Sequence, residues 1–145
     1  MTSPAPAQPA WVLYDGTCGL CDRSVQWLLR RDRRAALRFA RLEGPIGEEV
    51  RARHPRLPDA DETLLLVVSP REGDERVYCR SAAALRAVAR LGGRFGGVKL
   101  LLLVPPALRD ALYSWVARNR RRWFGRLESC RVPTPDERSR FLDAA

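Results

Sequence analysis

Two cysteines, Cys18 and Cys21, are the residues best able to do chemistry in this chain of 145 residues. They form a CxxC motif that follows a short apolar segment and precedes a helical pattern. At a helix start, unpaired backbone N–H groups and the positive end of the helix dipole stabilise a thiolate on the first sulfur. The second sulfur lies one turn on, within reach of the first. The motif therefore predicts thiol–disulfide exchange, in which Cys18 attacks a substrate disulfide and Cys21 resolves the mixed disulfide.

Metal binding and inert packing are the alternatives for this pair. A structural zinc site usually needs a second pair of Cys or His ligands at short spacing. The remaining cysteines, Cys79 and Cys130, stand far apart, and His54 is the single histidine. Redox chemistry is therefore favoured, and no metal or bound cofactor is expected because the electrons reside in the cysteine pair. Cys79 is expected to be buried and inert, whereas Cys130, in a predicted loop, is a candidate auxiliary thiol.

Asp15, three residues before Cys18, is the third candidate catalytic residue, and two roles compete for it. A carboxylate beside Cys18 opposes ionisation of that thiol, so a chemical role pairs Asp15 with Cys21, whose proton it would accept. In the other role, Asp15 is a turn residue that bonds the backbone N–H groups of residues 16–18, as Asp does before Gly. The sequence leaves both roles open and slightly favours the second.

The elements that position these residues follow from the apolar pattern. Apolar runs predict strands, four- and three-residue spacings predict helices, and Pro or Gly marks the ends. The predicted order is strand 11–14, helix to about 34, strand 37–42, helix 46–53, strand 63–68, strand 76–79, and a helix capped by Ser81 and stopped by Gly92-Gly93. This βαβ-α-ββα order predicts a mixed α/β sheet. Gly92–Gly97 is expected to be a flexible connector and His54 a solvated loop residue.

The chain is expected to divide into three parts. Residues 1–9 are a disordered Pro/Ala-rich tail, residues 10–97 form the α/β domain that carries the CxxC motif, and residues 98–145 form a helical extension and tail packed on it. The helix of the extension starts after Pro105-Pro106 and ends near Gly125, and Phe141 is a candidate for packing onto the domain. Residues 1–10 do not resemble an export signal, and no apolar run reaches the length of a membrane span, so a cytoplasmic protein is expected.

The charge balance points to the C-terminal extension as a candidate partner surface. The chain has 26 Lys plus Arg against 17 Asp plus Glu, a net charge of +9. The candidate surface comprises Arg118, Arg120, Arg121, Arg122, Trp123 and Arg126. An acidic or phosphorylated partner, single-stranded nucleic acid and an anionic membrane all fit such a pattern. The favoured interpretation is simpler, with arginines at a helix C-terminus and the tryptophans packed on the domain. Neither nucleic acid nor a membrane is favoured as a partner, and the oligomeric state stays open.

The stretch Tyr14-Asp15-Gly16-Thr17-Cys18-Gly19-Leu20-Cys21 resembles the DxxCxxC signature of the DCC family of thiol-disulfide oxidoreductases. Later blocks are similar too: Arg80–Leu85, Pro105 with Leu108-Arg109-Asp110, and Tyr113 through Asn119-Arg120 to Trp123-Phe124-Gly125 and Cys130. The resemblance covers about residues 10–133. It implies a thioredoxin-like fold and dithiol–disulfide exchange on protein or small-molecule disulfides. The rival function is a noncatalytic module that binds a metal through the CxxC or an anionic partner through the Arg/Trp-rich helix.

Overall fold

The computed structural model describes residues 9–15, 19–33, 36–57, 64–68, 75–125, 135 and 138–142. The strands are β1 (Ala10–Tyr14), β2 (Leu37–Arg41), β3 (Leu65–Val68) and β4 (Arg76–Cys79). The α-helices are α1 (Gly19–Arg31), α2 (Pro45–Arg53), α3 (Arg80–Ala89) and α4 (Pro106–Phe124). Two 3₁₀ segments follow α3 and α4, namely η2 (Gly93–Leu103) and η3 (Arg138–Arg140).

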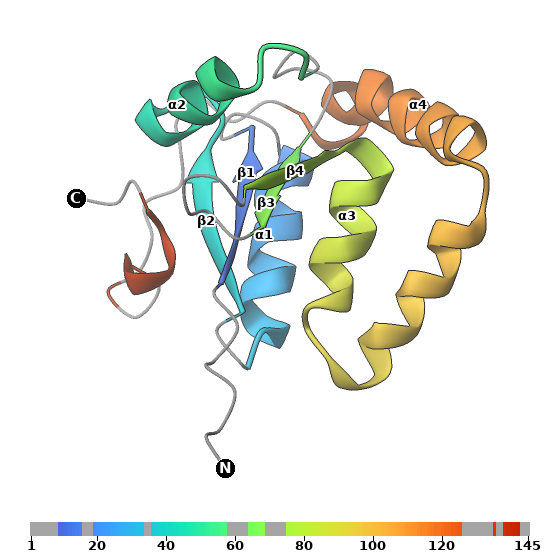
Figure 1. Cartoon of the computed structure of the whole chain (residues 1–145), viewed down its shortest axis with the longest axis horizontal. Coiled ribbons are helices and arrows are strands. Elements are labelled where there is room, and N and C mark those ends of the chain that lie inside the picture. The colour runs from blue at the N-terminus through green and yellow to red at the C-terminus, as the bar shows by residue number, and fades with distance from the viewer. Residues whose placement is uncertain are drawn as a thin grey trace.

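The four strands form one mixed sheet in the order β2-β1-β3-β4. β1 and β2 pair in parallel, as a connection through a helix requires, and β3 runs antiparallel to both β1 and β4. Figure 1 shows β1 inside the sheet with α1 directly after it in the chain. The element order matches the predicted βαβ-α-ββα, and this α/β arrangement is compatible with a thioredoxin-like fold.

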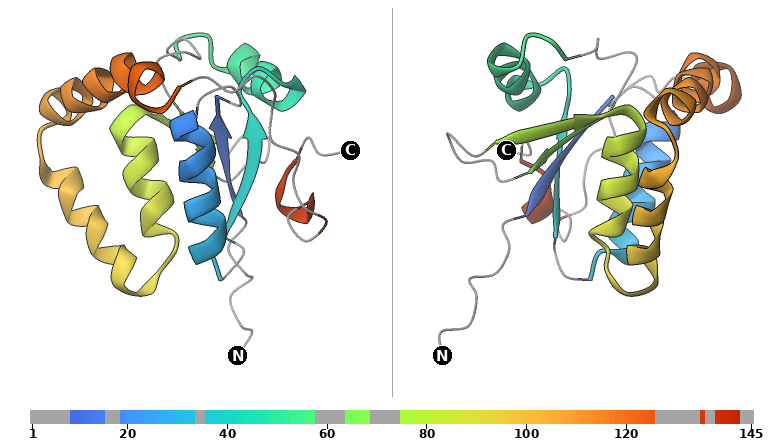
Figure 2. Two further views of the ribbon diagram at one scale, coloured as in Figure 1. Left: turned by 180° about the vertical axis from the view of Figure 1, so that it is seen from behind. Right: turned by 45° about the vertical axis from the view of Figure 1, so that its right-hand side comes forward.

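Helices cover both faces of the sheet (Figure 2), with α1 and α3 on one face and α2 on the other. Because successive residues of a strand point to opposite faces, neighbouring residues enter different cores. Val12 and Leu66 pack in the cluster that contains residues of α1 and α3, whereas Leu13 and Leu65 pack in the cluster that contains Val50 of α2. β1 is therefore buried on both sides, which fixes the position of the site at its C-terminal end.

Helix α4 begins at Pro106, the second residue of the Pro105-Pro106 pair, one residue earlier than predicted, and it ends before Gly125, as predicted. It packs against α1 and α3 and lies across their ends (Figure 2). Gly125 has a positive φ of 73°, the left-handed conformation that glycine supplies after a helix. The Gly19 N–H donates to the Gly125 carbonyl at 3.3 Å, so the end of α4 satisfies one unpaired donor at the start of α1.

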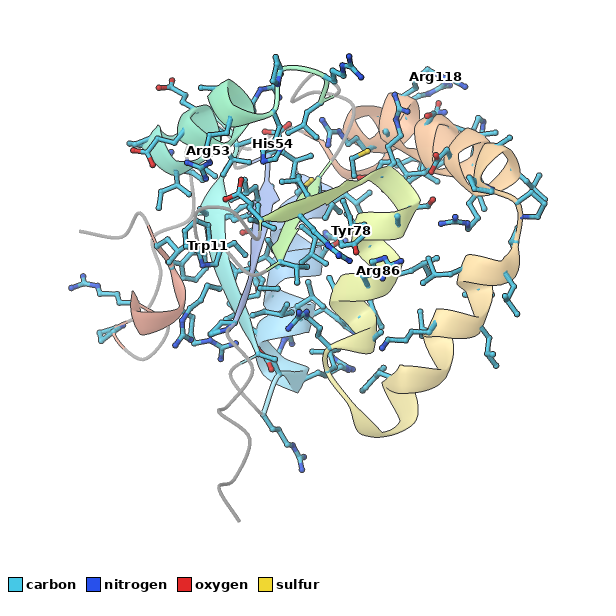
Figure 3. The ribbon with its side chains drawn as sticks, viewed as in Figure 1. Trp11, Arg53, His54, Tyr78, Arg86 and Arg118 are labelled. Atoms are coloured by element: carbon cyan, nitrogen blue, oxygen red, sulfur yellow. The ribbon has the colours of Figure 1, made fainter. Side chains whose placement is uncertain are left out.

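Three local expectations need correction. Gly92–Gly97 is not a flexible connector, because residues 93–103 form the 3₁₀ segment η2. Ser81 is not an N-cap, because α3 starts one residue earlier and the Ser81 hydroxyl donates to Asp110 of α4 at 2.5 Å. His54 lies in the loop after α2, as expected, but its side chain is only partly exposed and its Nε2 lies 2.6 Å from Glu75 Oε1. Figure 3 shows His54 beside Arg53, which also binds Glu75.

The predicted packing of Phe141 is confirmed, because Phe141 forms a bridge with Phe39 of β2. Arg140 binds the Asp32 carboxylate, which is buried and also accepts the backbone N–H of Leu37. Residues 1–8 of the predicted N-terminal tail lie outside the described residues. Within the described ranges no single helix is long and apolar enough to cross a bilayer. The helical segments 95–103 and 106–120 are long and apolar enough only when taken together, and they are bent by 116° relative to each other.

Candidate functional site

The site lies where β1 ends and α1 begins. Asp15 directly follows β1 and is 6% exposed, and Cys21 lies in the first turn of α1, where it is half-buried. The apolar strand holds Asp15 at the edge of the core, and the helix turns Cys21 back toward it. Cys18 lies outside the described residues together with residues 16 and 17, so its predicted role as nucleophile stays a prediction.

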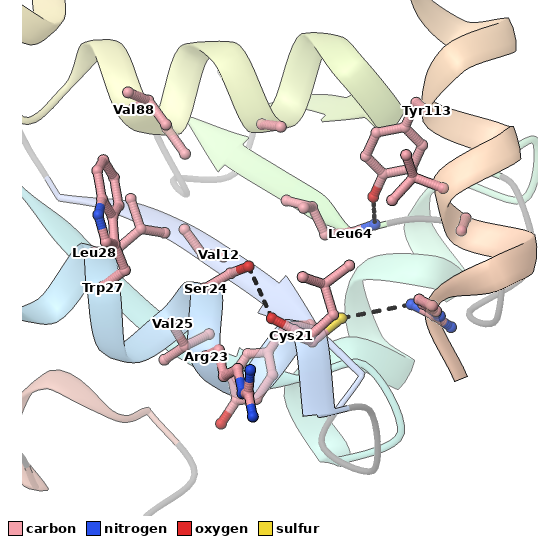
Figure 4. A pocket seen from close by; sticks show the side chains of 17 residues that line it. Val12, Cys21, Arg23, Ser24, Val25, Trp27, Leu28, Leu64, Val88 and Tyr113 are labelled. Atoms are coloured by element: carbon pink, nitrogen blue, oxygen red, sulfur yellow. Dashed lines mark hydrogen bonds between the residues drawn. The ribbon is translucent and has the colours of Figure 1, made fainter. Parts of the chain in front are cut away.

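Arg120 of α4 lies between Asp15 and Cys21 and is 4% exposed. Its Nη2 donates to Asp15 Oδ2 at 3.1 Å, and its Nη1 donates to Cys21 Sγ at 3.5 Å. Figure 4 shows the second of these bonds as the dashed line that ends on the Cys21 sulfur. One guanidinium thus joins the end of β1 to the start of α1, and we call Asp15, Arg120 and Cys21 the acid–arginine–thiol triad.

The triad has a defined electrostatic consequence. A buried carboxylate and a buried guanidinium are each costly to remove from water, and a direct hydrogen bond between them compensates that cost. A guanidinium next to a sulfur favours the thiolate over the thiol. Asp15 alone would oppose a negative charge on sulfur, but Arg120 balances the Asp15 charge. The arrangement is suited to a thiol that must ionise during reaction.

The expectation that Arg120 belongs to an outward partner surface is wrong. Arg120 shares one face of α4 with Tyr113, Val116 and Ala117, because residues three, four and seven apart lie together on a helix. These four residues, the inner face of α4, all line a cavity beside Cys21. The sequence did contain a signal for this role, because the helical spacing places Arg120 on the same face as Tyr113. The spacing does not say which face of α4 is covered, so it could not distinguish Arg120 from the neighbouring arginines.

The other members of the predicted surface lie elsewhere. Arg118 and Arg122 are exposed, and Figure 3 shows Arg118 at the outer edge of α4. The Arg126 residue and the Arg121 side chain lie outside the described part of the chain. The tryptophans do not pack on the domain as expected: Trp115 and Trp123 are about half exposed, and their rings pack against each other at 5.1 Å between centroids.

Two further contacts hold the inner face of α4 in place. The Leu64 N–H donates to the Tyr113 hydroxyl at 3.0 Å, which ties α4 to the segment that enters β3. At the start of α4, Asp110 accepts the Ser81 hydroxyl, and Arg109 donates to the same hydroxyl at 3.3 Å. Arg120 therefore reaches Asp15 from a helix that is anchored along its length, which gives the triad a fixed geometry.

A cavity of about 440 Å³ opens between α1, α3 and α4, with Cys21 in its wall. Its lining is mainly apolar and includes Val12 of β1 and Ala84 of α3. Figure 4 shows Trp27 and Val88 toward one end and Tyr113 toward the other. A cavity of this size is typical of sites for small molecules or single side chains.

The remaining thiols differ in what the structure shows. Cys79 is a free, half-buried thiol at the end of β4, and burial raises the pKa of this thiol. A raised pKa leaves little thiolate at neutral pH, which fits the predicted inert role. The candidate auxiliary thiol Cys130 lies outside the described residues. Among the residues that the structure describes, no group of three His, Cys, Asp or Glu side chains is arranged to hold a metal.

The mixed α/β fold is compatible with a thioredoxin-like protein, and the CxxC motif, whose Cys21 lies in the first turn of α1, is its candidate redox site. A sequence profile of the DCC1-like thiol-disulfide oxidoreductase family matches residues 12–126. The chain is 31% identical to the uncharacterized protein YuxK of Bacillus subtilis over 90% of this chain and 92% of that protein. It is 33% identical to a chloroplastic DCC family protein of Arabidopsis thaliana over 83% of this chain and 68% of that protein. The chain belongs to the DCC family. No solved structure matches it significantly.

Proposed function

We propose that the protein exchanges thiols and disulfides with protein or small-molecule substrates through Cys18 and Cys21. The observation that supports this most is the buried Arg120 guanidinium shared by Asp15 and Cys21. A structural thiol needs no cation beside it, whereas a thiol that must become a nucleophile gains from one. The family name, thiol-disulfide oxidoreductase, agrees with this function.

The exchange proceeds in two balanced steps. The Cys18 thiolate attacks one sulfur of the substrate disulfide, the substrate S–S bond breaks, and the first substrate thiol leaves after taking a proton from solvent. Cys21 then loses its proton, attacks the Cys18 sulfur and releases the second substrate thiol. Two electrons pass to the substrate, and the protein ends with a Cys18–Cys21 disulfide. The reverse sequence oxidises a substrate dithiol.

Arg120 and Asp15 act in the second step. Arg120 stabilises the developing thiolate on Cys21, and Asp15 is a positioning residue that holds Arg120 in place. An Asp15→Asn variant distinguishes this role from that of a proton acceptor. A positioning role predicts slower resolution with a pH profile that keeps its acid limb. A proton acceptor predicts a profile that loses its acid limb, because the group that must be ionised is gone.

A Cys21→Ser variant tests the function directly, because it removes the resolving thiol. We expect a mixed disulfide through Cys18 to persist with a model disulfide and to be identified by mass spectrometry. Cys79→Ser is the matched control and should leave no trapped adduct. The proposal is wrong if the trap captures nothing and Cys18 reacts no faster than a free thiol. Metal analysis of the purified protein, with thiols counted before and after reduction, tests the metal-binding rival.

A further inference from the structure

The cavity beside Cys21 is mainly apolar, with a few polar groups in its wall. Cys21 and Arg120 lie where the cavity adjoins the end of β1, and the Tyr113 hydroxyl accepts the Leu64 N–H. Trp27, Leu28 and Val88 line the part farther along α1 and α3 (Figure 4). A group that entered the cavity beside the sulfur would thus contact mainly apolar side chains.

We propose that this cavity binds an aromatic or branched aliphatic group that flanks the disulfide of the substrate. The inference rests on the proposed exchange at Cys18 and Cys21 and names the substrate class for it. A single side chain is much smaller than 440 Å³, so the cavity accommodates it without rearrangement. Burial of the apolar group supplies affinity, and the sulfur in the wall places the substrate disulfide at the reacting pair.

Two disulfides that differ only in the flanking residue test this inference. Pre-reduced protein is mixed with the disulfide of N-acetyl-Cys-Phe-amide or of N-acetyl-Cys-Ser-amide, and the rate of protein oxidation is followed by quenched alkylation. We expect the Phe compound to react roughly tenfold faster, because burying its ring is favourable. Ala84→Leu, which fills the cavity from α3, should bring the two rates together.

The control is Ala82→Leu, the same change on α3 at a residue outside the cavity lining. It should leave the preference for the Phe compound intact. Ala117→Leu fills the cavity from α4 and serves if Ala84→Leu melts at a lower temperature than the control. Equal rates for both disulfides, or a preference that survives both filling variants, overturn the inference alone. Failure of both disulfides to oxidise the wild type overturns the exchange itself.

A second observation, independent of the site, concerns the surface that α4 and η2 turn away from the sheet. Seven large apolar side chains of these two elements are exposed: Leu100, Leu101, Leu103, Leu108, Leu112, Trp115 and Trp123, which we call the outer face. Leu103 is 83% exposed and Leu108 is 64% exposed, on either side of the bend between η2 and α4. Several exposed large apolar side chains on two consecutive elements indicate an interaction site.

The charged side chains that are described as exposed on η2 and α4 are all cations. Lys99, Arg118 and Arg122 are exposed on the same two elements. Asp110 is the only carboxylate in residues 93–125, and its hydrogen bond from Ser81 holds it at the inner side of α4. The outer face is thus an apolar surface with cations on the same elements. It complements a partner that has an apolar interior and negatively charged groups at its surface.

We propose that the outer face binds peripherally to a membrane that contains anionic lipid. The apolar side chains would enter the boundary between headgroups and acyl chains, and the cations would meet the lipid phosphates. Tryptophan suits this depth because its ring is apolar and its N–H is polar. The bend of 116° between the two apolar segments fits a shallow position in one leaflet. A second copy of the chain is disfavoured because the two basic edges would repel each other.

Vesicle co-sedimentation of the full chain tests this proposal. We expect the wild type to bind vesicles of phosphatidylcholine with phosphatidylglycerol, to bind pure phosphatidylcholine more weakly, and to lose part of the binding at high salt. Leu103→Asp should weaken binding about tenfold or more, because it removes an inserted leucine and adds a repelled charge. Ala52→Asp, which adds the same charge at an exposed position of α2, should bind like the wild type.

Three outcomes overturn the membrane proposal. The first is no binding to the phosphatidylglycerol vesicles at low salt. The second is equal binding by Leu103→Asp and the wild type. The third is a wild-type dimer in analytical ultracentrifugation that Leu103→Asp converts to a monomer, because the outer face is then a contact between two copies of the chain.

Discussion

Helix α4 has two faces that differ in their partners although both carry arginine. On the inner face, Arg120 is 4% exposed and bonded to Asp15 and Cys21. On the opposite side, Arg118 and Arg122 are exposed beside half-exposed tryptophans. The same residue type therefore serves as a buried partner of the candidate redox site and as part of a cationic surface. The difference comes from which face of α4 lies against α1 and α3.

The largest expected effect separates the two faces directly. Arg120→Gln leaves the Asp15 carboxylate buried without its cation, which should lower the free energy of unfolding by about 3–5 kcal/mol. Arg118→Gln, the same change on the exposed side, should change it by less than about 0.5 kcal/mol. Urea denaturation measures both. Equal losses in the two variants would show that burial does not distinguish these arginines. A double variant, Asp15→Asn with Arg120→Gln, should recover part of the loss.

A smaller effect is expected where α4 ends. Gly125 has a positive φ, so Gly125→Ala should cost roughly 1–2 kcal/mol of unfolding free energy. Gly96→Ala is the matched control. An added Cβ meets no atom within 4 Å at either position, and only Gly125 has the unfavourable φ. Thermal unfolding of both variants measures the difference. A Gly125→Ala variant as stable as the control would contradict the left-handed end of α4.

The smallest expected effect on stability concerns an ionic cluster that lies away from α4. This cluster can be compared with the buried acid–arginine–thiol triad. Burial acts to raise the pKa of Glu75, but hydrogen bonds from Arg53 and His54 outweigh it and lower that pKa below the ordinary 4.5. The stability that this carboxylate contributes is present above its ordinary pKa and is lost as the pH falls through the lowered value. Glu75→Gln should therefore cost about 1 kcal/mol at neutral pH.

The measurement is the free energy of unfolding of Glu75→Gln and the wild type at neutral pH and at a pH well below 4.5. The difference between the two proteins should shrink as the pH falls, because the wild-type carboxylate also becomes neutral. A difference that is constant with pH would show that the ionised form of Glu75 gains nothing from Arg53 and His54.

Local signals in the sequence were sufficient for the element order. The apolar run before Asp15, the helical spacing of Cys21, Val25 and Leu28, and the Pro105-Pro106 start of α4 each act over a few residues, and the structure confirms these elements. Ser81 shows where such signals fail. A serine near a helix start is a common cap, but here its hydroxyl is taken by Asp110, which lies on another helix.

The sequence by itself determined the family, the CxxC motif and its place between a buried strand and a helix. Only the tertiary structure decided that Arg120 joins the site, that Trp115 and Trp123 stay at the surface and that His54 binds Glu75. The physical reason is that periodicity specifies which residues share a face of a helix but not what covers that face. The packing of α4 across α1 and α3 determines which face of α4 is covered, and it brings together residues that are far apart in the chain.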